Sequence, residues 1–331
     1  MTTMLQLVQQ LPEQLRWAAD LQIPDTPSAE AAIVAGMGGS GIAGDVAAVV
    51  AEEAGRRVVV HKSYDLPRWV GSEDLVVAVS HSGNTEETAT SVSAALAGGF
   101  ALVGVTTGGA MAERAAEVGF STVVVPPCPQ PRAAFGHLVG ATLRVLESAG
   151  IVGPQSEDLR EAADVTGAIL DGEGPETAAR LAEALAGRMT VVYGGSGPAS
   201  VAANRWKTQI NENAKAPAAW VPLPEADHND IVGWTAHPDF SAGSFGAVFL
   251  SDSGDHPRVS LRGRLTRRLM EGMVDGAEVV ASRGISTVAR LFSLTVVGDL
   301  VSLALAERSA SDPMPVDIIE DFKIRLAGES E

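Results

Sequence analysis

The sequence predicts an α/β protein with two tandem domains, each built on a doubly wound parallel sheet. The expected strands are continuous apolar runs, such as "LVVAV" at residues 75–79, rather than alternating ones. Continuous runs are typical of parallel strands that helices cover on both faces. Strand-like and helix-like segments alternate along the chain, which favours repeated βα units. The same plan occurs twice, which indicates a duplicated domain.

The first half is predicted to begin with an amphipathic helix within residues 1–22. A strand, a glycine turn and a helix follow in "AAIVAGMGGSGIAGDVAAVVAEEAG" at residues 31–55. The further strands and helices of this half are expected at 56–63 (strand), 75–83 (strand), 85–96 (helix), 100–107 (strand) and from Ala110 (helix). The predicted N-terminal domain spans residues 1–150.

The second half repeats this plan in "TVVYGGSGPASVAANRWKTQINENA" at residues 190–214 and in "VFLSDSGDHPR" at residues 248–258. A connecting segment near "GIVGPQSED" separates the halves, which places the second domain at residues 151–331. The last segment, "DPMPVDIIEDFKIRL", follows a proline stop and predicts a short amphipathic helix that carries Lys323.

Composition and charge limit the classes of function. Hydrophobic residues make up 46% of the 331 residues and charged residues 20%, as in a globular protein with a large core. The net charge of −17 argues against nucleic acid or an anionic membrane as partner. We expect no signal peptide and no stretch near the roughly 20 apolar residues of a membrane span. The single Cys128 excludes an intramolecular disulfide and fits a reducing cytoplasm.

A glycine-rich turn, "GMGGSG" at residues 36–41, follows the first strand and opens the next helix. Its spacing matches the dinucleotide-binding fingerprint, which also needs an acidic residue at the end of the second strand. His61 and Lys62 stand there instead, so dinucleotide binding is disfavoured. The glycines still let a ligand approach the backbone, and helix N-terminal amides favour an anion.

Hydroxyl side chains crowd the end of the third strand, in "SHSGNT" at residues 80–85. Ser80, Ser82 and Thr85 supply three hydroxyls, and the amides of the following helix N-terminus face the same way. Any one hydroxyl could simply cap the helix, but three hydroxyls beside a second glycine turn exceed what a cap needs. We interpret the stretch as a neutral phosphate cup without Lys or Arg. His81 is expected to line it rather than to act chemically.

The second copy of this cup differs in charge. It carries Asp252 and Asp255 where the first copy has His81 and Asn84. Two carboxylates would repel an anion, so only the first half is expected to bind one.

Together these motifs resemble a known family. "GMGGSGIAGD" and "SHSGNTEET" look like the sugar isomerase (SIS) domain. "PRAAFG", "RWKTQINENAKAPA", "EADHND" and a terminal "DFK" are similar to the bifunctional phosphoglucose/phosphomannose isomerases of that superfamily. The resemblance covers essentially the whole chain and implies two tandem SIS (flavodoxin-like) domains that bind a sugar phosphate. The residues it assigns to the phosphate are Gly39, Ser40, Ser80, Ser82 and Thr85.

The resemblance further implies an aldose–ketose isomerase that interconverts glucose 6-phosphate with fructose 6-phosphate, with mannose 6-phosphate as a second candidate substrate. The proton that moves between C1 and C2 needs a carboxylate to carry it, and the resemblance assigns this role to Glu212. The enediolate that forms needs a fixed cation. Arg132 stands at an expected helix start, where a cation is disfavoured, so it is predicted to face a ligand.

Ring opening needs a group that exchanges protons near neutral pH, and histidine is the side chain suited to this. The resemblance assigns this step to His228 and Lys323, with His228 reaching the site of the neighbouring protomer in a homodimer. The chain departs from the family pattern at one position that bears on the mannose epimer. In the dual-specificity enzymes a Thr that allows attack on both C2 epimers is expected two helical turns before the terminal Lys. Val316 stands at that position here.

No metal or redox cofactor is expected, because His228 has no second His or Cys at ligand spacing. Two alternatives stay open. The protein could isomerise another phosphosugar, such as an amino or heptose sugar. It could also be a non-catalytic sugar-phosphate sensor, which would keep the cup but need neither Glu212 nor Lys323.

Overall fold

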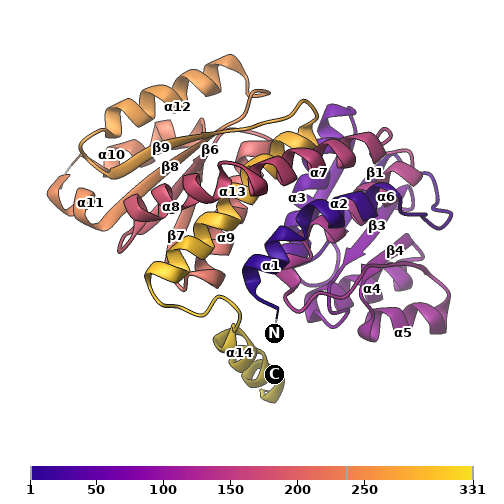
Figure 1. Ribbon diagram of the computed structural model, residues 1–331. Helices are drawn as coiled ribbons and strands as arrows, with labels where there is room; N and C mark the ends of the chain where they lie inside the picture. The colour runs from indigo at the N-terminus through magenta and orange to yellow at the C-terminus, as the bar shows by residue number, and fades with distance from the viewer. Residues whose placement is uncertain (1, 236–237, 330–331) are drawn as a thin grey trace.

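The computed structural model describes residues 2–235 and 238–329, which form two lobes, each built on its own parallel sheet (Figure 1). The first lobe contains α1 (Met4–Gln9), α2 (Leu11–Ala19), β1 (Ala31–Ala35), α3 (Gly38–Glu53), β2 (Arg57–His61), β3 (Asp74–Val79), α4 (Glu86–Gly98), β4 (Ala101–Thr106), α5 (Gly109–Val118), β5 (Ser121–Val124), the 3₁₀ turn η1 (Pro131–Ala133) and α6 (Phe135–Ser148).

The rest of the chain forms the second lobe and a terminal helix. Its elements are α7 (Ser156–Asp171), α8 (Gly174–Leu185), β6 (Met189–Gly194), α9 (Pro198–Asn213), β7 (Ala218–Pro222), η2 (Glu225–His228), α10 (Asp230–Gly233), α11 (Pro238–Ser244), β8 (Phe245–Ser251), α12 (Pro257–Met270), β9 (Asp275–Ala281), α13 (Thr287–Arg308) and α14 (Asp317–Gly328).

The first sheet has the strand order β2-β1-β3-β4-β5, and every neighbouring pair is parallel. The order reverses between β1 and β3, so the loops that leave these two strands run to opposite sides and open a crevice at their carboxyl ends. The glycine turn follows β1 and the cup follows β3. The topology therefore brings both predicted anion-binding motifs to one crevice.

The second sheet repeats this arrangement with the order β7-β6-β8-β9, again all parallel. Its order reverses between β6 and β8, whose following loops are the second copies of the two motifs. The predicted α/β fold with two tandem parallel sheets is confirmed. The boundary predicted at residue 150 falls in the turn between α6 and α7 and stays a prediction.

A layer of helices joins the lobes. α7 packs on both α2 and α13, and α13 packs on α7, α8 and α9. One continuous hydrophobic cluster runs from Val8 to Ala306 through both halves. The lobes therefore share a core, although each has its own sheet.

Helix α13 corrects one expectation. In the portion of the chain that the structure describes, α13 alone is long and apolar enough to span a membrane by length and composition, with a mean hydropathy of 1.8. Its most apolar window is 83% buried inside the protein. The helix is apolar on most of its surface because other helices surround it, as expected for a core helix.

Close contact between α9 and α13 depends on one glycine. The indole of Trp206 in α9 donates a hydrogen bond from Nε1 to the Leu294 carbonyl of α13, at 2.8 Å. Any side chain at Gly298 would collide with that indole ring. The pair fixes the spacing of the two helices that carry much of the candidate site.

The two ends of the chain differ in detail from expectation. The leading segment forms two helices that meet at Gln10, two residues before Pro12, rather than one. A proline within the first turn starts a helix but cannot continue one, which accounts for the break. The predicted terminal helix is present as α14 and lies apart from both lobes (Figure 1).

Candidate active site

The hydroxyls of the cup form hydrogen bonds within their own loop. Ser80 Oγ and Thr85 Oγ1 lie 2.9 Å apart, and Ser80 Oγ accepts the Gly83 N–H at 3.1 Å. Ser82 Oγ accepts the Asn84 N–H at 3.2 Å. Thr85 is the N-cap residue of α4, yet its side chain makes no capping bond. The capping alternative therefore does not account for these hydroxyls.

Gly83 is the residue that shapes this loop. Its φ of +71° lies in the left-handed region, and a Cβ there would collide with the Gly108 carbonyl oxygen. A side chain at this position would meet both a conformational penalty and a steric one. The tight curl of the cup thus requires glycine.

The glycine turn adds a second free helix end to the crevice. Helix α3 begins after Met37, and no side chain caps its N-terminus. Ser40 is buried, and its hydroxyl makes no hydrogen bond within the described residues. A Cβ on Gly36 would lie 2.8 Å from the Val79 carbonyl oxygen of β3, so the two motifs are in close contact. Two uncapped helix ends with a free hydroxyl form a site suited to an anion.

Arg132 and Glu212 meet beside this crevice. Arg132 Nη1 lies 3.4 Å from Glu212 Oε2, with the two side chains 4% and 30% exposed. Arg132 belongs to η1 of the first half and Glu212 to the end of α9 in the second half. A Cβ on Gly39 would lie 3.7 Å from the Arg132 Cα, which places the pair next to the glycine turn. The predicted cation and the predicted base are therefore brought together beside the glycine turn.

The guanidinium of Arg132 is held on all sides. Its Nε donates to Asn213 Oδ1 at 2.8 Å and its Nη1 to Gln130 Oε1 at 2.6 Å. Its Nη2 donates to the carbonyls of Pro313 and Met314. Burial lowers the pKa of Arg132, and the Glu212 carboxylate opposes that shift. The side chain stays a fixed cation because an arginine pKa lies far above neutral.

The structure does not bring His228 or Lys323 to this pair within one chain. His228 lies at the end of η2, where its side chain is exposed and makes no hydrogen bond within the described residues. Lys323 is 63% exposed, and its ammonium pairs with Glu320 of its own helix. Val316, two helical turns before Lys323, is the N-cap residue of α14.

Sequence reasoning missed three side chains that touch the pair: Gln130, Asn213 and Lys215. Lys215 Nζ donates to the carbonyls of Glu212 and Pro315, at 2.5 and 2.7 Å. The polar run "NENAK" was a visible signal, since an amphipathic helix rarely ends in so many polar residues. The bonds to residues 313–315 carried no sequence signal, because they join segments about 100 to 180 residues apart.

The second copy of the cup is filled by its own carboxylates. Asp252 pairs with Arg290 at 3.0 Å and accepts the Gly254 N–H. Asp255 Oδ2 accepts the Asp252 N–H at 3.2 Å, and a Cβ on Gly195 would lie 2.5 Å from the Asp255 carboxylate. These carboxylates take the loop amides that a bound anion would need.

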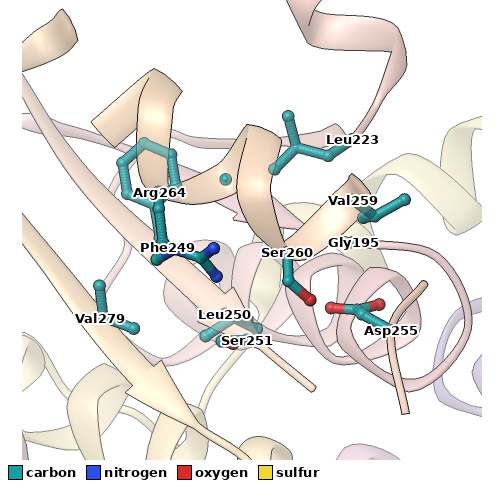
Figure 2. Close-up of a pocket in the computed structure, with 11 residues that line it drawn as sticks. Gly195, Leu223, Phe249, Leu250, Ser251, Asp255, Val259, Ser260, Arg264 and Val279 are labelled. Carbon is teal, nitrogen blue, oxygen red and sulfur yellow. The ribbon is translucent and has the colours of Figure 1, made fainter. Parts of the chain in front are cut away.

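A small cavity remains at this second cup. Asp255 and Ser260 point toward each other at its wall, below the apolar Leu223 and Val259 (Figure 2). Its volume of about 50 Å³ admits water but not a sugar phosphate, since ligand sites for small molecules are several times larger. The arrangement agrees with a binding role for the first cup alone.

Residues that could hold a metal are not gathered anywhere within residues 2–235 and 238–329: no group of three or more His, Cys, Asp or Glu has the required geometry. Two histidines bear on the charge of the cup. His81, within the cup, is buried, and its Nε2 has no hydrogen-bond partner among the described residues. Burial, together with His81, lowers the pKa of the half-buried His137 to about 4. Both imidazoles are therefore neutral at pH 7, and the cup carries no positive charge from them.

Two comparisons define the class of the protein. Residues 175–326 match the family model of the bacterial phospho-glucose isomerase C-terminal SIS domain. The fold is similar to that of a tagatose-6-phosphate ketose/aldose isomerase from Escherichia coli, with a TM-score of 0.70 and 17% identity over 94% of both chains. The chain is thus a tandem SIS-domain protein, as the resemblance implied.

Curated relatives define the family more narrowly. A bifunctional phosphoglucose/phosphomannose isomerase from Caldicellulosiruptor bescii is 37% identical over 98% of this chain and 99% of its own. One from Aquifex aeolicus is 36% identical over 89% of both chains. The chain belongs to the bifunctional phosphoglucose/phosphomannose isomerase family.

A first prediction concerns Asp255, whose pKa is raised to about 6, chiefly by burial. The ordinary pKa of an aspartate in an unfolded chain is 3.8. Between pH 3.8 and about 6 the native state therefore binds more protons than the unfolded state, and it loses stability as pH rises through this range. Asp255→Asn removes this penalty and keeps an acceptor for the Asp252 N–H. We expect Tm to rise by roughly 2 °C at pH 7.5, and by less at pH 4.5.

Thermal denaturation at both pH values measures this difference. Asp252→Asn is the matched control: it weakens the ion pair with Arg290 and should lower Tm at pH 7.5. An equal gain for Asp255→Asn at both pH values would contradict the charge argument.

Proposed function

We propose that this protein interconverts glucose 6-phosphate and mannose 6-phosphate with fructose 6-phosphate through an enediol(ate). The observation that carries the proposal is the Arg132–Glu212 pair, which lies beside a neutral cup with two uncapped helix ends. Family membership supports the same reaction, since the relatives bear the name of bifunctional isomerases.

The substrate phosphate binds in the crevice between β1 and β3. Gly39 and Ser40 offer amides and a hydroxyl from one side, and Ser80, Ser82 and Thr85 offer hydroxyls from the other. An incoming phosphate oxygen replaces the hydroxyl–hydroxyl contact between Ser80 and Thr85, after which both groups donate to it. Because the net charge of the chain is −17, the protein as a whole repels an anion, and this local set of hydrogen-bond donors must supply the attraction for the phosphate.

Glu212 carries the proton between C1 and C2. Its carboxylate is 30% exposed and lies 3.4 Å from Arg132, which adjoins the glycine turn, so an opened sugar bound by its phosphate can reach it. It removes a proton from one carbon and returns it to the other, with the enediolate as intermediate. Arg132 stabilises the negative charge that develops on the sugar oxygens. Because hydrogen bonds already hold its guanidinium in place, little reorganisation is needed during the reaction.

Ring opening and closing use His228 and Lys323. We propose a homodimer in which the partner protomer supplies His228, because this exposed side chain makes no contact with the pair in its own chain. Helix α14 also leaves its apolar Ile318 and Phe322 exposed, as expected of a surface that another protomer covers. We place the enzyme in the cytoplasm, where the free Cys128 would stay reduced.

Activity on a panel of sugar phosphates tests the function directly. Coupled assays that contain EDTA should show conversion of fructose 6-phosphate to the glucose and mannose epimers, with little activity on amino or heptose phosphates. Binding of these sugars without turnover would favour a sensor. A loss of turnover in EDTA would contradict the metal-free mechanism.

The base is tested by Glu212→Gln. Turnover should fall about 10²-fold or more, the scale of a lost general base, with KM within a few-fold because the cup is intact. Glu307→Gln, an exposed carboxylate at the end of α13, is the matched control and should keep full activity. Nearly unchanged turnover in Glu212→Gln would move the proton transfer to another residue.

If ring opening and carbon proton transfer use different residues, His228→Ala and Glu212→Gln should have different effects. His228→Ala should lose activity on the cyclic sugar yet still exchange the C2 deuteron of an open-chain analogue, whereas Glu212→Gln should lose both. Complete loss of exchange in His228→Ala would show that His228 takes part in the carbon proton transfer.

The shared site predicts complementation between inactive variants. A heterodimer of Glu212→Gln and His228→Ala contains one site with both wild-type residues if His228 crosses the interface. Reassociation of an equal mixture should then restore about a quarter of wild-type activity. If both residues act within one chain, the mixture stays as inactive as its components.

A further inference from the structure

A polar stripe lies inside the otherwise apolar contact between α9 and α13. Arg205, Gln209 and Asn213 recur every four residues along one face of α9, and Asp299 and Ser302 face them from α13. All five side chains are buried. The stripe ends at Arg132, which lies at the edge of this interface.

Asn213 connects the stripe to the guanidinium. Its Oδ1 accepts the Arg132 Nε–H at 2.8 Å, and its Nδ2 donates to Ser302 Oγ at 2.9 Å. Ser302 Oγ in turn donates to the Asp299 carbonyl at 2.6 Å. The amide of Asn213 therefore cannot rotate without breaking bonds at both of its ends.

Arg205 holds the backbone of Arg132. Its Nη2 donates to the Arg132 carbonyl at 3.2 Å and to Asp299 Oδ2 at 2.7 Å. Its guanidinium also stacks on the Phe135 ring, with Cζ 3.8 Å from the ring centroid. Arg132 is thus fixed at both its carbonyl and its Nε.

A buried ion pair of this kind is poorly explained by stability alone. Desolvation of two charges commonly cancels their attraction, and apolar residues of similar volume often stabilise such a site as well or better. Among the residues that the structure describes, Arg205 Nε and Asp299 Oδ1 are buried and find no hydrogen-bond partner, which adds to the cost. What the arrangement does provide is a fixed geometry for Arg132.

We propose that Asn213 and Ser302, supported by the Arg205–Asp299 pair, are positioning residues that hold the Arg132 guanidinium against Glu212. They touch no substrate and act through Arg132 alone. The proposal rests on the proposed isomerase function. It adds a buried hydrogen-bond network that links the contact between α9 and α13 to the Arg132 guanidinium.

The test uses the full-length protein and compares Asn213→Leu and Ser302→Ala with wild type. Asn213→Leu keeps the branching at Cγ but removes the acceptor, so we expect kcat to fall about 10-fold with KM within about 3-fold. Ser302→Ala leaves the amide free to rotate and should lower kcat by a smaller factor. Thr295→Val is the matched control: it removes another buried hydroxyl of α13, which bonds only the Phe292 carbonyl, and kcat should not change.

A double-mutant cycle separates positioning from general destabilisation. In an Arg132→Lys background, neither Asn213→Leu nor Ser302→Ala should lower kcat further, because the group they position is gone. Additive losses in that background, or an equal loss of kcat in Thr295→Val, would overturn the proposal. If Asn213→Leu does not fold, the Ser302→Ala cycle decides on the same criterion. An inactive wild type with normal folding would contradict the proposed function itself, which is a distinguishable outcome.

Discussion

The contact between α9 and α13 is the constraint on which the site depends. Gly298 lets the two helices approach until Trp206 bonds the α13 backbone, and this spacing sets where the end of α9 lies. Glu212 stands at that end, so its 3.4 Å distance to Arg132 follows from helix packing elsewhere in the core. Neither lobe contains the pair alone. The active centre exists because two duplicated sheets share one layer of helices.

Duplication has left two cups with opposite electrostatics. In the first, Ser80 and Ser82 accept the Gly83 and Asn84 amides. Two uncapped helix ends stand beside them, without a carboxylate among the cup residues 80–85. In the second, Asp252 and Asp255 accept the equivalent amides and Arg290 neutralises part of their charge. The same backbone geometry thus leaves neutral hydroxyls for an anion in one copy, as the proposed function requires, and stabilises its own loop in the other.

Much of the fold could be predicted from the sequence because its signals are local. Continuous apolar runs identify parallel strands, and the glycine and hydroxyl motifs mark the carboxyl ends of β1 and β3. Arg132 and Glu212 were chosen from chemistry and resemblance, and the structure brings them together. The polar stripe around Asn213 could not be predicted, since its bonds join helices that lie about 90 residues apart. The sequence around a single buried polar residue in a helix does not indicate which distant residue it bonds.

The distribution of charge explains why the cup needs no cation of its own. A lysine in the cup would bind a phosphate dianion strongly, but it would also attract the Glu212 carboxylate and compete with Arg132 for it. In the proposed mechanism, helix dipoles and hydroxyls bind the phosphate, and their field falls off within a turn. Arg132 would then keep Glu212 as its anionic partner until the substrate arrives. Its positive charge would act on the oxygens of the enediolate, where new negative charge appears during the proposed reaction.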